Sequence, residues 1–411
     1  MRVIHLSTAI SDSSAAVRQH KALLKQGVNS YIYTMYNLTS DVGNVIVIKP
    51  TFVEKVFNKA LMFVENLILR FRNEERESLP FSVGWRNVSL KKYIESNDII
   101  HFHWTCGFIS NRQYQKIKSG YSTVITCHDN WYLTGGCHVR MECTKDGTGC
   151  KECNHFKSNL SQKVPIALQK KKCGRDYLKK VVYVSPSVWM DNNAKRSLVT
   201  KNAERVIVPN TLEVDVFNRT GRDKMRKKLK IEDSYVVLFG AVNGVNVEYK
   251  GFKYLVEALK LLNADVVKKE IVLLIFGSSE IPEHLADIGY RTICLGKIES
   301  MSAMAEIYSC ADVFVVPSLE DSFNQTVVES QCCETPVVAF KTGGIIENIE
   351  HMSSGYLADY RDSTDLAKGI VWIYENNENN VLGKTGRTNM INKCNEEVVA
   401  RKLMDIYKQM Q

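Results

Sequence analysis

Short apolar runs recur along the chain, and most of them are followed by a polar or glycine-containing loop and then by a helical pattern. The runs lie at residues 3–6, 31–35, 45–48, 99–102, 124–127, 181–184, 206–208, 236–240, 271–276, 313–316 and 337–340. Continuous apolar strands joined by helices are typical of parallel sheets whose two faces are both covered. The pattern therefore predicts an α/β protein.

The second half of the chain contains the clearest strand–helix–strand unit. Its first strand is predicted at residues 313–316, its helix at 324–333 and its second strand at 337–340. Pro317 ends the first strand, and Gly343-Gly344 follows the second. In such a unit, the strand ends and the helix N-terminus form the ligand-binding edge of the sheet.

Two carboxylates make this unit a candidate ligand site. Asp321 lies in the loop before the helix, and Glu329 lies about a turn and a half inside it. The two side chains can therefore face one pocket from two levels. The alternative is that Asp321 is an ordinary charge at a helix N-terminus and Glu329 is a solvated helix residue.

The unit resembles the donor-binding signature of retaining glycosyltransferases of family 4. That signature is an acid, seven further residues, a Glu, a small-x-Pro-Val-Val segment and a Gly-Gly turn, here Asp321, Glu329, Thr335-Pro336-Val337-Val338 and Gly343-Gly344. Asp321 stands where the family usually has Glu. The resemblance implies the GT-B architecture, in which two Rossmann-like doubly wound domains face each other across a cleft.

The resemblance also implies roles for these residues. Asp321 would contact the donor sugar, Glu329 would bind the ribose hydroxyls, and backbone N–H groups at the helix start would lie near the diphosphate. Besides Glu329, the implied donor-binding residues are Ser322, Phe323, Asn324, Gly343, Gly344, Gly277 and Ile298.

Lys250-Gly251 opens a helix in the second half and matches the Lys-Gly pair of the family. Its ammonium would neutralise the donor diphosphate, so that catalysis is expected to need no metal or other cofactor. Ala241 stands where the family usually has Arg. Lys297 or Arg18 could replace that base, and the sequence leaves the choice open.

Polar residues also follow the apolar runs of the first half. His128-Asp129 matches a strand-end His-Asp pair that lies beside the transferred sugar in the family, so His128 joins Asp321 and Lys250 as a predicted catalytic residue. The expected acceptor-side residues are Ser13, Ser14, Arg18, His103, Trp104 and Asp129.

The length of 411 residues allows two domains with sizeable cores. The predicted domains are residues 1–210, with an insertion at 131–156, and residues 211–390. The resemblance implies that residues 391–411 form a helix that packs back across the junction.

The insertion holds four of the twelve cysteines: Cys137, Cys143, Cys150 and Cys153. One C-x2-C pair and two further thiols fit a structural zinc ion whose four positions are all filled by the protein. Two disulfides or four unliganded thiols are the alternatives. A subset of bacterial family members, in surface-polysaccharide synthesis, has a similar Cys-rich loop.

The two halves of the chain differ in charge. Residues 1–210 contain 31 Lys and Arg against 16 Asp and Glu, whereas the remainder contains 23 against 29. A basic half suggests an anionic partner such as a membrane surface, a lipid pyrophosphate or nucleic acid, or it merely solvates exposed helices. Residues 51–72 are strongly amphipathic, which fits either a membrane-surface helix or a core helix.

The resemblance implies a hexosyltransferase that uses a nucleotide-diphosphate sugar, and the basic, amphipathic first half favours a saccharide or lipid-linked acceptor in surface-polysaccharide biosynthesis. The first residues read as a strand and no apolar run is long enough to span a membrane, so the expected location is the cytoplasm, including the cytoplasmic face of the inner membrane. No nucleic-acid partner is expected. The alternative is a non-catalytic GT-B scaffold, or a basic nucleic-acid-binding protein with structural zinc.

Overall fold

The chain divides into two compact units in a computed structural model, which describes residues 1–39, 41–173, 179–240, 247–262, 267–281, 285 and 288–411. Unit 1 comprises Met1–Thr211 and Glu396–Gln411, and unit 2 comprises Leu212–Asn395. The predicted boundary after residue 210 lies next to the observed one. The predicted C-terminal segment begins too early, because the chain remains in unit 2 as far as Asn395.

Unit 1 contains, within its described residues, a seven-stranded parallel sheet in the order β3-β2-β1-β4-β5-β6-β7. Its strands are β1 (Arg2–Ser11), β2 (Asn29–Leu38), β3 (Val45–Val47), β4 (Ile99–Phe102), β5 (Ser122–Thr126), β6 (Val181–Ser185) and β7 (Glu204–Ile207). The strand order reverses between β1 and β4. Ligands bind beyond the carboxyl ends of the strands at such a switch point.

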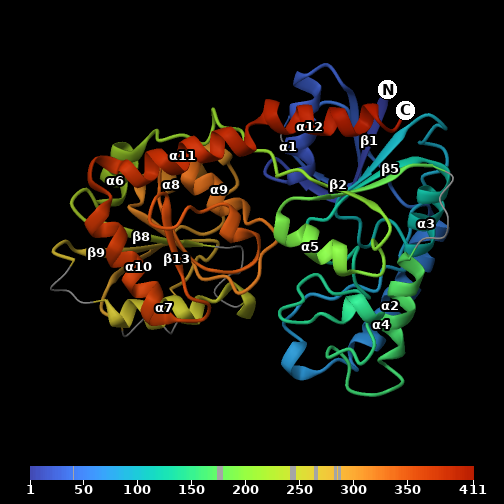
Figure 1. The fold of residues 1–411 in the computed structure, drawn as a ribbon, viewed down its shortest axis with the longest axis horizontal. Helices are drawn as coiled ribbons and strands as arrows, with labels where there is room; N and C mark the ends of the chain where they lie inside the picture. The colour runs from blue at the N-terminus through green and yellow to red at the C-terminus, as the bar shows by residue number, and fades with distance from the viewer. Residues whose placement is uncertain (40, 174–178, 241–246, 263–266, 282–284, 286–287) are drawn as a thin grey trace. The chain divides into compact units, whose positions relative to one another are not determined.

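The helices of unit 1 include one from the end of the chain. They are α1 (Ala15–Lys25), α2 (Phe52–Leu69), α3 (Asn111–Gly120), α4 (Lys163–Lys172), α5 (Val188–Arg196) and α12 (Glu396–Lys408). The last helix, α12, lies beside α1 (Figure 1). Its buried side chains Val399, Leu403 and Tyr407 share a core cluster with Val3 and Val124 of the sheet. The final helix therefore completes unit 1.

The amphipathic helix α2 turns its apolar side chains outward. Phe52, Phe57 and Phe63 are 81%, 63% and 72% exposed. The buried residue of α2 is Glu65, whose carboxylate accepts a hydrogen bond from the backbone N–H of Trp85 at 3.0 Å. The interpretation of residues 51–72 as an ordinary core helix is therefore wrong. None of the described helices is long and apolar enough to cross a membrane.

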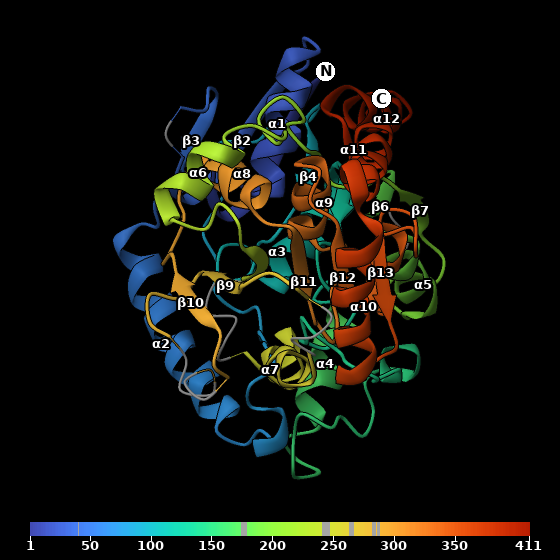
Figure 2. The ribbon, with the colours of Figure 1, turned by 90° about the vertical axis from the view of Figure 1, so that its left-hand side faces the viewer.

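Unit 2 contains, in its described part, a six-stranded parallel sheet in the order β10-β9-β8-β11-β12-β13. Its strands are β8 (Tyr235–Gly240), β9 (Ile271–Phe276), β10 (Arg291–Cys294), β11 (Val313–Val316), β12 (Val337–Phe340) and β13 (Gly355–Ala358). Its helices are α6 (Arg222–Leu229), α7 (Phe252–Leu261), α8 (Met301–Cys310), α9 (Gln325–Cys332), α10 (Ser363–Asn376) and α11 (Val381–Cys394). Helix α10 lies against β12 and β13 (Figure 2). The switch point of this sheet lies between β8 and β11.

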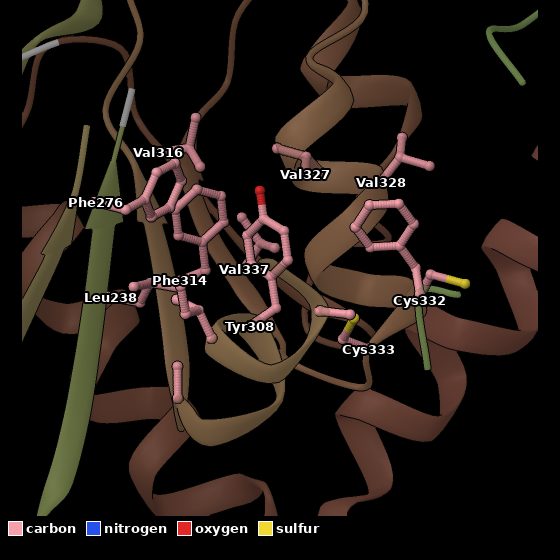
Figure 3. Packing of buried hydrophobic residues seen from close by; sticks show 14 of the residues in the cluster. Leu238, Phe276, Tyr308, Phe314, Val316, Val327, Val328, Cys332, Cys333 and Val337 are labelled. Carbon is pink, nitrogen blue, oxygen red and sulfur yellow. The ribbon is translucent and has the colours of Figure 1, made fainter. Parts of the chain in front are cut away.

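Aromatic rings and small thiols fill the core between the sheet of unit 2 and helices α8 and α9. Tyr308 packs edge-on against Phe276 and Phe314, with ring centroids 6.0 and 5.5 Å away (Figure 3). Cys332 and Cys333 pack in the same cluster. This packing fixes α9 against β11 and so fixes the loop between them, which carries Asp321.

Candidate active site

Asp321 lies in the loop between β11 and α9, beside the switch point of unit 2. Its carboxylate accepts hydrogen bonds from the backbone N–H of Asn324 at 2.8 Å and that of Phe323 at 3.3 Å. The side-chain amide of Asn324 donates to the other carboxylate oxygen at 3.2 Å. The start of α9 therefore holds the carboxylate in one orientation. Asn324 itself caps α9, because its side-chain oxygen accepts from the N–H of Val327 at 3.1 Å.

Lys250 comes from the loop after β8 and meets Asp321. Its ammonium lies 3.0 Å from a carboxylate oxygen of Asp321. Burial opposes the charge of Lys250, but the neighbouring carboxylate raises the pKa of the lysine above its usual value. The ammonium is therefore charged at neutral pH, in a position where it can hold an anion.

Gly251 and Gly343 allow three loops to approach one another at this point. A Cβ added to Gly251 would lie 1.8 Å from the carbonyl oxygen of Pro317, and one added to Gly343 would lie 2.2 Å from that of Asp321. Both glycines have positive φ angles, of 71° and 58°. The backbone N–H of Gly344 donates to the carbonyl oxygen of Asp321 at 2.9 Å. The structure thus brings Lys250, Asp321 and the Gly343-Gly344 turn together, as the sequence predicts.

Glu329 lies inside α9 and is almost completely buried. The hydroxyl of Tyr308 donates to its carboxylate at 3.1 Å. The sequence analysis missed Tyr308, since nothing in the spacing of α8 indicates that its side chain reaches α9. The predicted contact of Glu329 with a ribose stays a prediction.

The other predicted donor-side residues occupy neighbouring positions in unit 2. Gly277 directly follows β9, has a φ of 86° and donates its N–H to the carbonyl oxygen of Gly296 at 2.7 Å. Ser322 lies in the Asp321 loop, and Ile298 packs at the margin of the core. Ala241 lies outside the described residues, so the missing arginine of the signature has no structural account.

Unit 1 places three histidines in a hydrogen-bonded row at its own switch point. His128 Nε2 lies 2.8 Å from His103 Nδ1, and His103 Nε2 lies 2.8 Å from His5 Nδ1. Burial lowers the pKa of His128 to about 4, although the adjacent Asp129 carboxylate opposes this effect. His128 is therefore a neutral imidazole near pH 7. Its Nε2 is engaged with His103, and this bond fixes its orientation.

Two of the predicted acceptor-side residues are buried rather than accessible. His103 lies between His5 and His128 and supports His128 instead of lining a surface, because its ring is removed from solvent. Arg18 is fully buried in α1. Trp104, in contrast, is 42% exposed directly after β4. The strand-end signal found His103, but only the pairing of β4 with β1 shows that it meets His5.

The remaining predicted residues of unit 1 lie at the ends of β1 and β5. Ser14 is the N-cap residue of α1, and the Ser13 hydroxyl lies 3.3 Å from that of Ser11. Asp129 accepts a hydrogen bond from His138 Nδ1 at 2.6 Å. It therefore binds the Cys-rich loop, a contact that the sequence analysis did not foresee.

The four clustered cysteines lie together in that loop. Cys137, Cys143, Cys150 and Cys153 line one small enclosed cavity, and all of them are free thiols. The alternative of two disulfides is not what the structure shows. Whether these thiols hold a metal stays a prediction at this point.

Comparison with known proteins assigns the part of the chain that carries the Lys250–Asp321 pair. Residues 234–376 match the family described as glycosyl transferases group 1. Unit 2 contains a group 1 glycosyltransferase domain. The matched segment includes Lys250, Asp321, Glu329 and the Gly343-Gly344 turn.

The individual relatives that this chain matches are distant. The chain is 23% identical over 227 residues to the N-acetyl-alpha-D-glucosaminyl L-malate synthase of Bacillus anthracis, which covers 52% of this chain and 56% of that protein. It is also 27% identical over 218 residues to the lipopolysaccharide 1,2-N-acetylglucosaminetransferase of Salmonella typhimurium. That alignment covers 49% of this chain and 56% of the Salmonella protein. The alignments thus span only about half the length of these relatives.

Solved structures resemble the whole chain. The Anabaena HepE structure in complex with UDP-glucose superimposes with a TM-score of 0.63 at 13% identity, covering 100% of both chains. The chain has the GT-B fold. At such low identity the likeness establishes the fold only, so activity and substrates follow below as proposals.

Proposed function

We propose that the protein is a retaining glycosyltransferase that moves a hexose from a nucleoside diphosphate sugar to a saccharide or lipid-linked acceptor in surface-polysaccharide biosynthesis. The observation that carries this proposal is the 3.0 Å Lys250–Asp321 pair at the switch point of unit 2, inside the segment that matches the group 1 glycosyltransferases. A charged lysine beside a helix N-terminus is suited to hold a diphosphate.

Each group in unit 2 has a distinct task in this proposal. Lys250 and the N–H groups at the start of α9 stabilise the negative charge that develops on the departing diphosphate. Asp321 binds the hydroxyls of the donor sugar. Gly344 holds its backbone and Asn324 holds its carboxylate in place for this contact. Glu329, oriented by Tyr308, binds the ribose. The lysine supplies the positive charge, so the proposed reaction needs no metal ion.

His128 has a different task, which its electrostatics support. A neutral imidazole beside the reacting sugar can donate or accept a hydrogen bond without repelling a positively charged transition state. Its low pKa keeps it neutral throughout the physiological range. We propose that His128 contacts the transferred sugar and that Trp104, exposed at the end of β4, contacts the acceptor.

The donor proposed first is a UDP-hexose or UDP-N-acetylhexosamine, in line with the UDP-glucose bound to the structural relative and the N-acetylglucosamine named for two relatives. The test incubates the protein with a panel of nucleotide sugars and a lipid-linked saccharide fraction, and determines the anomeric configuration of the product by NMR. We expect transfer with retained configuration. Inverted configuration, or transfer that persists unchanged in Asp321→Asn, would contradict the proposal.

A specific observation favours a membrane surface as the site of action. The exposed face of α2 combines Phe52, Phe57 and Phe63 with the exposed side chains of Lys55 and Lys59. A helix with aromatic residues beside lysines binds at the interface of an anionic membrane. We therefore propose that α2 lies on the membrane that carries a lipid-linked acceptor. The surplus of basic residues in the first half of the chain would also attract an anionic membrane surface.

Removing two aromatic rings from α2 is expected to release the protein from vesicles. We predict that Phe57→Ser/Phe63→Ser loses most of its co-sedimentation with vesicles containing phosphatidylglycerol, because each ring contributes roughly 1.5–3 kcal/mol when it leaves water. Leu160→Ser/Leu261→Ser is the matched control, since both leucines are exposed outside α2. Equal sedimentation of the α2 variant and the wild type would exclude α2 as the contact.

A further inference from the structure

The four cysteines of the loop after β5 surround a cavity of ionic size. Cys137, Cys143, Cys150 and Cys153 line it together with Thr134, Arg140, Lys145 and Asp146, and its volume is about 10 Å³, room for roughly one water-sized sphere. The side chains of Cys137 and Cys153 are in hydrogen-bonding contact. Three of the four are buried, and Cys143 is partly buried. The loop thus brings four thiols together around one small cavity.

The backbone of the loop points donors at these sulfurs. The N–H of Gly135 donates to Cys150 Sγ at 3.2 Å, and the N–H of His155 donates to Cys153. Cys150 and Glu152 have positive φ angles of 53° and 51°, a conformation that costs roughly 1–3 kcal/mol at each non-glycine residue unless its surroundings enforce it.

Two lysines near the cysteines form no ion pair with a described carboxylate, whereas Arg140, which also lines the cavity, pairs with Asp146 at 3.0 Å. Lys172 is fully buried, yet its ammonium donates only to the backbone carbonyls of Trp131 and Thr134, the latter at 3.1 Å, and no carboxylate of the described chain forms an ion pair with it. Lys145 donates to the side chain of Asn154 at 2.9 Å and to a carbonyl oxygen. Both ammonium groups interact electrostatically with cysteines of the cluster, and Lys172 also interacts with the carboxylate of Asp129. A buried cation requires a nearby negative charge.

We propose that Cys137, Cys143, Cys150 and Cys153 bind one zinc ion as a structural tetrathiolate centre. Zinc with four thiolates carries a net double negative charge, which would lie near the buried ammonium of Lys172, a group that forms no ion pair with a described carboxylate. All four positions around the metal are filled by the protein, so the centre has no place for a substrate.

Metal binding requires the loop to tighten. Sulfurs around one zinc ion lie about 3.8 Å apart, given Zn–S distances of about 2.3 Å. In residues 131–156, all of which are described, no three of the sulfurs lie within 4.8 Å of one another. Gly136 and Gly149, both with positive φ, lie next to Cys137 and Cys150 and allow this adjustment.

Another candidate metal site, formed by His5, His101 and His103, is less suited. Ligand nitrogens of His5, His101 and His103 lie within 4.8 Å of one another. However, both ring nitrogens of His101 are already engaged at 2.7 Å, with Tyr407 and Thr126. His103 is likewise bonded at both nitrogens. A metal there would have to break these bonds, whereas the thiols have few competing partners.

The zinc centre would support two neighbouring features of unit 1. Cys137 and Cys153 pack in one cluster with Ile68 and Leu69, at the inner side of α2. His138 directly follows Cys137 and binds Asp129. Loss of the metal is therefore expected to loosen α2 and the contact to Asp129, while leaving unit 2 intact.

The test measures zinc in the purified full-length protein by elemental analysis. We expect one zinc ion per chain in the wild type, and loss of that zinc in both Cys143→Ser and Cys150→Ser. Cys173→Ser and Cys294→Ser are the matched controls, because both cysteines are partly buried but lie outside the cluster, and they should retain the metal. His5→Gln should also retain it.

A second measurement covers variants that fail to fold. Cobalt bound to the wild-type protein should show the charge-transfer and d–d absorption bands of a tetrahedral tetrathiolate. The proposal would be overturned if the wild-type protein contained no zinc or if Cys150→Ser retained it. It would also be overturned by disulfides within the loop after isolation under reducing conditions, or by cobalt bands without sulfur character. None of these readouts depends on transferase activity.

Discussion

Replacing Lys250 with methionine is expected to lower kcat/KM for the nucleotide sugar about a hundredfold to a thousandfold, the usual effect of removing one preorganised donor from a developing negative charge. The methionine keeps the length of the side chain but cannot neutralise the diphosphate. Lys250 is the described cation that pairs with Asp321 at the switch point.

The matched control for this change is Lys253→Met. Lys253 lies three residues further on, in the first turn of α7, is exposed, and stacks on the ring of Tyr254 at 5.1 Å. We expect its variant to retain full activity. Steady-state kinetics of the two variants, with thermal melts to confirm folding, would contradict the assignment if Lys250→Met turned over as fast as Lys253→Met.

Unit 1 is expected to lose stability as the pH falls from about 6.5 toward 5. Burial lowers the pKa of His101 to about 3, that of His128 to about 4 and that of His155 to about 3. Between about pH 6.5 and pH 5 the unfolded chain therefore binds protons that the folded chain does not bind. The free energy of unfolding decreases as the pH is lowered through this window. With a pKa of about 6.5 in the unfolded chain, each of these histidines lowers the free energy of unfolding by about 2 kcal/mol at pH 5.

This loss is large beside the total stability of a typical domain, about 5–15 kcal/mol. Urea melts at pH 7.5 and pH 5 would measure it by tryptophan fluorescence, since Trp85, Trp104, Trp131 and Trp189 of the five tryptophans lie in unit 1. His101→Gln should be less stable at both values but should show a smaller pH dependence. Equal midpoints for the wild type at the two pH values would show that the histidines are not held neutral.

Much of unit 2 follows from its sequence because its central strands are continuous apolar runs with clear ends. Residues 313–316 and 337–340 were predicted as strands and form β11 and β12. The edge strands β10 and β13 were missed, since neither is a continuous apolar run. Edge strands are buried on fewer sides, so their sequences carry a weaker apolar signal.

The candidate site was predictable where it follows a local motif and not where it depends on strand order. Asp321, Lys250 and Gly343 could be found because each belongs to a short local motif that resembles the family signature. The bond between His5 and His103 could not be found, since it joins residues 98 positions apart. The outward face of α2 was also undecided, because an amphipathic pattern is the same for a helix on a core and a helix on a membrane.

The measurement that tests the account most directly is calorimetric titration of the protein with UDP, GDP, ADP and their sugars. Wild type, Lys253→Met and Lys250→Met would be compared at one pH and salt concentration. The account predicts that one nucleoside diphosphate and its sugar bind the wild type and Lys253→Met equally, and bind Lys250→Met much more weakly. No binding to the wild type, or equal binding to Lys250→Met, would contradict the assignment of the donor site to unit 2.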